Sequence, residues 1–98
     1  MIIINIEVIR MLYKRYVEVI ARFDKGGNVM PLKIIWDHGI TYDVDKILQI
    51  KHQAYSKVGG GGTMYKCMIG GYERTLFFER GNTALDVGQR WFIESLKP

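Results

Sequence analysis

Short runs of Val, Ile, Tyr, Phe and Trp alternate with polar residues along most of this chain, and glycine-rich turns separate the runs. The turn signals lie at residues 24–28, 37–39, 59–62 and 70–71. Apolar residues at every second position give a strand one face toward a core and one face toward water or a partner. Because no crossover helix links the runs, the pattern predicts an all-β domain of antiparallel strands joined by hairpins.

The first two strands are predicted over residues 16–23 and 29–36. The side chains expected to point inward from the first strand are Val17, Val19, Ala21 and Phe23. Pro31 has no N–H to donate, which places it at an edge or at a strand start.

The turn after the second strand determines the register of the next strand. We expect a three-residue loop over residues 37–39, with Gly39 in the left-handed conformation of a β-bulge. A two-residue turn would instead place the Asp43 carboxylate beside Ile34 on the buried face, which is unfavourable. The longer loop pairs Trp36 with Ile40, Ile34 with Tyr42, Lys33 with Asp43 and Leu32 with Val44.

Residues 47–57 fit either a helix or a bulged strand, because the apolar phase slips at Asp45 and Lys46. We favour the strand, since a hairpin follows directly and a bulged strand can turn the corner of a small barrel. The glycines at 59–62 then lead into a strand over 63–69, and a type I′ turn at Gly70 and Gly71 leads into a strand over 72–79. That register pairs Ile69 with Tyr72, Cys67 with Arg74 and Tyr65 with Leu76, and it points Tyr65, Cys67, Ile69, Tyr72, Leu76 and Phe78 inward, with Arg74 near the barrel mouth.

Residues 81–89 are expected to form a looser connection with a helical turn around 84–87, followed by a last strand over 90–96 with Trp91 and Ile93 inward. Five to six such strands favour a small antiparallel barrel of the SH3-like or Sm-like kind, closed or nearly closed. Residues 16–98 would form this single domain, and residues 1–15 an N-terminal extension that is either a helix or an extra strand. Alternatively, Met11 is the true start and the first ten residues are a gene-start artefact.

Composition says more about where the protein is expected to be found than about what it does. The chain has 98 residues, a net charge of +4 and a single cysteine, Cys67, so an internal disulfide and a multi-cysteine zinc site are excluded. The apolar start lacks a basic residue ahead of it and a small-residue cleavage site, and no apolar run is long enough to span a bilayer. We therefore expect a cytoplasmic protein without a membrane partner.

No arrangement of residues demands catalytic chemistry. The glycines at 59–62 lack the Lys and the following helix of a phosphate-binding loop, and they fit a flexible hairpin better than a loop that orders on a ligand. His38 is expected at a turn tip, His52 at the edge of the core, and Cys67 as a buried small hydrophobe. We expect no enzyme activity, no cofactor and no metal.

One surface carries a candidate site. If the hairpin pairs about the centre of its glycines, the outward side chains form a basic strip that consists of Lys51, Gln53, Tyr55, Lys57, Met64, Lys66 and Met68. Lysines with an aromatic ring and adaptable methionines are typical of a groove for a phosphate backbone or a partner protein. The competing interpretation is an ordinary solvated strand face, since exposed lysines also protect strand edges.

Three strings carry a family resemblance. They are YVEVIARFDKGGNVMPLKIIWDHGITYDVDKIL at 16–48, YKCMIGGYERTLFFE at 65–79 and RWFIE at 90–94. Together they resemble a family of short uncharacterised proteins of Firmicutes, across about four fifths of the chain. The resemblance implies a small β-barrel without an assigned activity, often encoded near Y-family DNA polymerases, and so a role beside DNA repair. Residues 1–15 and the longer segment at 81–89 depart from that pattern.

The leading hypothesis is a non-enzymatic adaptor barrel that binds single-stranded DNA or RNA, as an accessory to a DNA polymerase or another protein. The residues expected to contact nucleic acid are Lys51, Tyr55, Lys57, Lys66 and Arg74. The alternative is a protein-interaction module, a homodimer or a polymerase accessory, with an apolar patch of Ile20, Ile35, Phe77, Met64 and Met68. A small ligand in the barrel mouth near Arg74 and His52 is the third hypothesis.

Overall fold

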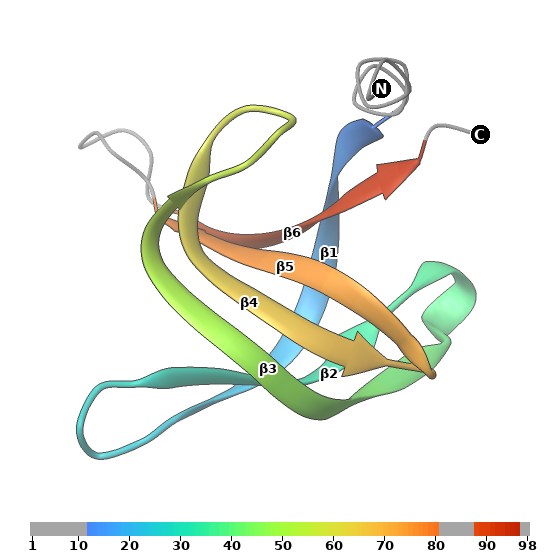
Figure 1. The fold of residues 1–98 in the computed structure, drawn as a ribbon. Coiled ribbons are helices and arrows are strands. Elements are labelled where there is room, and N and C mark those ends of the chain that lie inside the picture. Colours follow the sequence, from blue (N-terminus) through green and yellow to red (C-terminus); the bar gives the residue numbers. More distant parts are fainter. Residues whose placement is uncertain (1–11, 81–87, 97–98) are drawn as a thin grey trace.

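The computed structural model describes residues 12–80 and 88–96, which form a closed barrel of antiparallel strands (Figure 1). The strands are β1 (Leu12–Phe23), β2 (Val29–Ile35), β3 (Thr41–Tyr55), β4 (Gly61–Ile69), β5 (Tyr72–Arg80) and β6 (Gln89–Leu96), with a short 3-10 turn η1 (Asp37–Gly39) between β2 and β3. Each strand pairs with the next, and β6 pairs with β1 to close the barrel. The predicted small all-β barrel is confirmed. In the described part of the chain, no helix has the length and apolarity needed to cross a membrane.

β1 closes the barrel because it pairs with both β6 and β2. Its first half, up to Val17, pairs with β6, and its second half, from Glu18, pairs with β2. Leu12–Arg15, which we assigned to an N-terminal extension, are the start of this strand, with Leu12 opposite Leu96. The rest of that extension and the helical turn expected at 84–87 lie outside the described residues.

The predicted loop between β2 and β3 is confirmed. Ile34 pairs with Tyr42, Lys33 pairs with Asp43, and Lys33 Nζ lies 2.9 Å from Asp43 Oδ1. Gly39 has the expected positive φ of 75°. The pair expected between Leu32 and Val44 does not form within these described strands, because the ladder between them ends at Lys33.

The barrel interior is filled by inward side chains from all strands. Ile34, Cys67 and Leu76 are almost completely buried at its centre. The larger cluster also contains Val29, Tyr65, Ile69, Phe78, Trp91 and Ile93, with Val17, Val19 and Ala21 packed against it. Phe23 and Tyr72 were expected inside but are 61% and 67% exposed, since both lie at strand ends where the barrel opens.

β3 is a strand through Tyr55, which confirms the strand interpretation over the helix. Its register against β4 shifts at three places, between Val44 and Ala54, and such bulges bend a strand. Figure 1 shows the result as a long curved ribbon (green) that wraps around one side of the barrel. The turn between β4 and β5 keeps the predicted register, with Cys67 opposite Arg74 and Tyr65 opposite Leu76.

Candidate nucleic-acid interface

The outer face of β3 and β4 carries lysines in successive rows. In the ladder Lys46 pairs with Met68, Gln49 with Lys66 and Lys51 with Met64. Two rows lie between these, Ile47 with Cys67 and Ile50 with Tyr65, and their β4 side chains point into the core, so the other three rows share the outer face. We call these residues the basic wall: Lys46, Gln49, Lys51, Met64, Lys66 and Met68.

A bulge makes this wall possible. Lys46 and Lys51 are five residues apart, and in a regular strand that odd spacing would place them on opposite faces. The register shift between Ile47 and Gln49 inserts Leu48 as an extra residue, which brings both lysines to the same side. Sequence reasoning missed Lys46 and Gln49 for this reason. The phase slip after Val44 was the only available signal.

The lysines of the basic wall have no acidic partner among the described residues. Lys46, Lys51 and Lys66 appear in no ion pair of that part of the chain. Other basic residues do: Arg15 pairs with Asp37, and Lys14 and Arg90 share Glu79. An unpaired row of ammonium groups creates a positive potential to which an anion is attracted.

The glycine-rich turn is anchored on the barrel. The Ser56 N–H donates to the Gly60 carbonyl at 2.9 Å, so the hairpin is centred on Val58 and not on the glycines. The Ser56 hydroxyl and the Lys57 N–H both donate to Glu94 Oε1 of β6, at 3.0 and 3.2 Å. The expected flexible hairpin is therefore a packed one, and its register differs from the predicted one.

The hairpin covers two phenylalanines on the outside of the barrel. Phe77 and Phe92 stack with their ring centroids 4.9 Å apart, and Ala54, Val58 and Met64 pack over them. Phe77 is only 1% exposed. The expected apolar patch was therefore wrong at Phe77, and its remaining members lie on different strands, with Ile20 and Ile35 on β1 and β2.

The structure brings together two of the five residues predicted to bind nucleic acid, because Lys51 and Lys66 both lie on the basic wall. Tyr55 follows Ala54, which packs on the outer Phe77 and Phe92, so alternation points Tyr55 to the opposite side of the sheet. Lys57 lies after the end of β3, in the hairpin, where its N–H donates to Glu94 of β6. Tyr55 is 92% exposed. Arg74 is separate, because it lies opposite the buried Cys67 and faces the open end of the barrel interior. Gln53 was expected beside Tyr55 on the basic strip. It lies instead in the last bulge of β3, between Lys51 and Ala54, and has a φ of 55°.

The remaining candidate residues do not form a reactive site. Cys67 is completely buried, and burial raises the pKa of its thiol to about 11, as expected for a small core side chain. His38 lies in the η1 turn, as predicted, whereas His52 is exposed on a bulge, with Nδ1 3.5 Å from the Thr63 hydroxyl. No group of three His, Cys, Asp or Glu side chains in the described residues could hold a metal ion.

Comparisons of the chain with protein-family models, with curated proteins and with solved structures each found no match. The resemblance to the Firmicutes family therefore stays a prediction.

Proposed function

We propose that the protein binds single-stranded nucleic acid along the basic wall and acts by binding, not by catalysis. The observation that supports this most directly is the row of lysines from Lys46 to Lys66, which has no acidic partner in the described part of the chain. Lysines that neutralise phosphates release counterions, and this release supplies much of the affinity for nucleic acid.

The neighbouring side chains suit a strand with unstacked bases. Met64 and Met68 lie between the lysines and can adapt to varied surfaces. Tyr55 exposes almost its whole ring at the end of β3, on the side of the strand opposite to the wall, and a base of a bound strand that crosses this end can stack on it. Lysines combined with an exposed aromatic ring are typical of proteins that bind single strands with little sequence preference.

Edge protection does not account for the whole wall. Lysines often protect an unpaired strand edge from aggregation. Lys66 lies on β4, which is paired on both sides, with Gln49 of β3 and Thr75 of β5. A phosphate backbone gives that lysine a partner, and the surface would suit the accessory role beside a DNA polymerase that the resemblance implies.

The test is fluorescence anisotropy with a labelled twelve-nucleotide oligo-dT at low salt. Three wall lysines predict a salt slope of about −2 in log K against log salt, at roughly −0.7 for each neutralised phosphate. The double variant Lys51→Glu with Lys66→Glu should remove most of the binding. Its matched control is Arg22→Glu with Lys25→Glu, which makes the same change of net charge on the β1–β2 hairpin, away from the wall.

The proposal fails if the oligonucleotide does not bind at low ionic strength, or if its binding does not depend on salt. It also fails if the control pair weakens binding as much as the wall pair, because binding would then follow net charge alone.

A further inference from the structure

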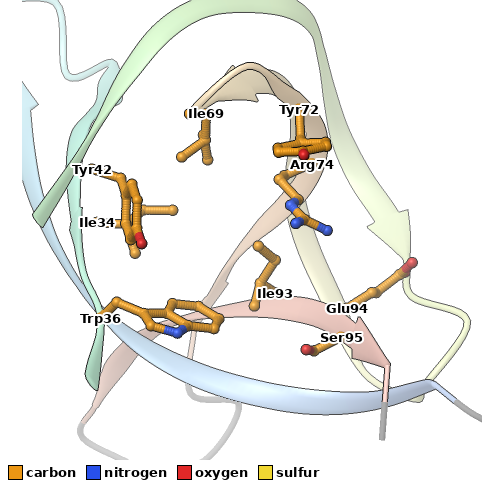
Figure 2. Close-up of a pocket in the computed structure, with 10 residues that line it drawn as sticks. Ile34, Trp36, Tyr42, Ile69, Tyr72, Arg74, Ile93, Glu94 and Ser95 are labelled. Carbon is orange, nitrogen blue, oxygen red and sulfur yellow. The ribbon is translucent and has the colours of Figure 1, made fainter. Parts of the chain in front are cut away.

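One open end of the barrel holds a cavity of about 280 Å³. It is formed where β2 and β6 end and where β3 and β5 begin, and Figure 2 shows its side chains around a common space. The floor is apolar and consists of Ile34, Ile69 and Ile93, each at most 7% exposed. A cavity of this volume with an apolar floor has room for one ring of a ligand. Its volume is at the small end of the range found for ligand pockets.

The walls of the cavity are aromatic. Tyr42 lies opposite Ile34 in the ladder and Tyr72 lies opposite Ile69, so both occupy inward positions at the rim. They are nevertheless 41% and 67% exposed, which means that no described side chain fills the space between them. Aromatic rings that stand open at the mouth of a site provide faces on which a planar ring can stack.

Arg15 packs against the Trp36 ring. The Arg15 guanidinium lies 3.8 Å from the centroid of the indole ring, and its charge is paired with Asp37. Stacking and the ion pair together fix the orientation of this ring. The indole therefore forms a rigid wall of the cavity, and it reports on occupancy by fluorescence.

Arg74 supplies a positive charge at the same cavity. Its guanidinium lies 5.5 Å from the Tyr72 ring centroid, and it forms no ion pair with another described residue. The Glu94 carboxylate also lines the cavity, and its Oε1 accepts hydrogen bonds from Ser56 and Lys57 of the hairpin. A guanidinium that forms no ion pair is available to an anion, and its planar set of donors fits phosphate.

The cavity is close to the basic wall. The Lys46–Met68 row follows the row of Val44 and Ile69, and Ile69 forms part of the cavity floor. A single strand that follows the wall toward the turn at Gly70 reaches the rim, because neighbouring rows are only about 3.4 Å apart along a strand.

From this arrangement we infer that the barrel mouth takes the base and phosphate of one nucleotide of the bound strand, with the base among Trp36, Tyr42 and Tyr72 and the phosphate on Arg74. This inference rests on the proposed function and adds to it a specific nucleotide subsite. A methylated lysine, which aromatic cages also bind, is disfavoured here by the charge of Arg74.

The experiment follows the emission of Trp36 during titration with oligo-dT, with thymidine 5′-monophosphate and with thymidine. The other tryptophan, Trp91, is buried in the core. The oligonucleotide and the monophosphate should quench part of the emission, and thymidine, which lacks the phosphate, should quench much less. The variant Trp36→Phe should bind the oligonucleotide without that quenching, which assigns the signal to the mouth.

Two variants test the residues of the mouth. Arg74→Gln and Tyr72→Ala should each weaken oligonucleotide binding about tenfold. Both side chains are exposed, so circular dichroism should show a folded barrel in each case. Arg22→Gln is the matched control for the arginine, because Arg22 is exposed on β1 and lines no part of the cavity. This control should bind as the wild type does.

The outcomes separate the two proposals. If the oligonucleotide binds through the wall lysines but leaves Trp36 emission unchanged, and Arg74→Gln has no effect, the inference about the mouth is overturned and the proposed function stands. If only the monophosphate binds, in a manner that depends on Arg74, the mouth takes a nucleotide and the wall proposal fails. Tighter binding of a peptide that ends in phenylalanine, with its ring and carboxylate, overturns the nucleotide assignment.

Discussion

Gly61 is the residue at which the packed hairpin is most sensitive to a small change. A Cβ at this position would lie 2.1 Å from the carbonyl oxygen of Ala54, far inside van der Waals contact. Ala54 is buried against Phe77 and Phe92, so it cannot move aside without lifting the hairpin. The substitution Gly61→Ala therefore tests whether the hairpin is part of the folded core.

The expected cost follows from what the lifted hairpin exposes. Full burial of a Phe side chain stabilises a protein by about 1.5–3 kcal/mol, so uncovering roughly half of each of two rings costs about the same, 1.5–3 kcal/mol. Loss of the hydrogen bond between Ser56 and Glu94 adds about 1 kcal/mol. We expect Gly61→Ala to lower the free energy of unfolding by about 2.5–4 kcal/mol in total.

Gly59→Ala is the matched control. Gly59 has a φ of 96° but open space around its Cβ position, so the variant carries only the strain of a left-handed residue, about 1–2 kcal/mol. Urea unfolding with linear extrapolation measures both variants against the wild type. Equal losses in the two variants, or a loss below about 1 kcal/mol for Gly61→Ala, would refute the packed hairpin.

Two further predictions concern titrating groups. Burial alone would raise the pKa of Glu79, but hydrogen bonds from Lys14 and Tyr16 outweigh it, so the pKa lies below its usual 4.5. Glu79 then contributes stability that is complete above that ordinary value and is lost as pH falls through the lower folded value. Glu79→Gln should cost about 1–2 kcal/mol at neutral pH, and thermal unfolding should show this difference shrinking as pH falls below the ordinary pKa of a Glu side chain; a difference independent of pH would contradict it. The raised pKa of the Cys67 thiol, about 11, predicts that a thiol reagent at pH 8 labels the native protein far more slowly than the urea-unfolded chain, and equal rates would show that the thiol is accessible.

Turn chemistry made much of the fold predictable. The pairing of Lys33 with Asp43 and of Cys67 with Arg74 both followed from short turns whose length and glycines leave one favourable register. Local residues determine such turns, so the sequence next to them was sufficient. The same reasoning gave the buried Tyr65 and Ile93, which alternate with polar neighbours along regular strands.

The candidate site was harder to predict, because bulges and long-range packing determine it. The extra residue at Leu48 shifts the face on which Lys46 points, and nothing in the alternation specifies where the extra residue falls. Phe77 points outward, as the pattern indicated, but a hairpin from another strand covers it. Tyr72 follows the inward alternation and remains exposed because the barrel ends there.

The division of β1 between its two neighbours has a consequence for how the chain is made. Leu12 finds its partner at Leu96, so the barrel cannot close until β6 has emerged from the ribosome. Until then β1 and β5 present open edges to solvent, and Phe77 of β5 lacks the ring of Phe92 that stacks on it. Translation that slows before β6 would therefore leave this small protein in its most aggregation-prone form, with an aromatic surface uncovered beside two unpaired strands.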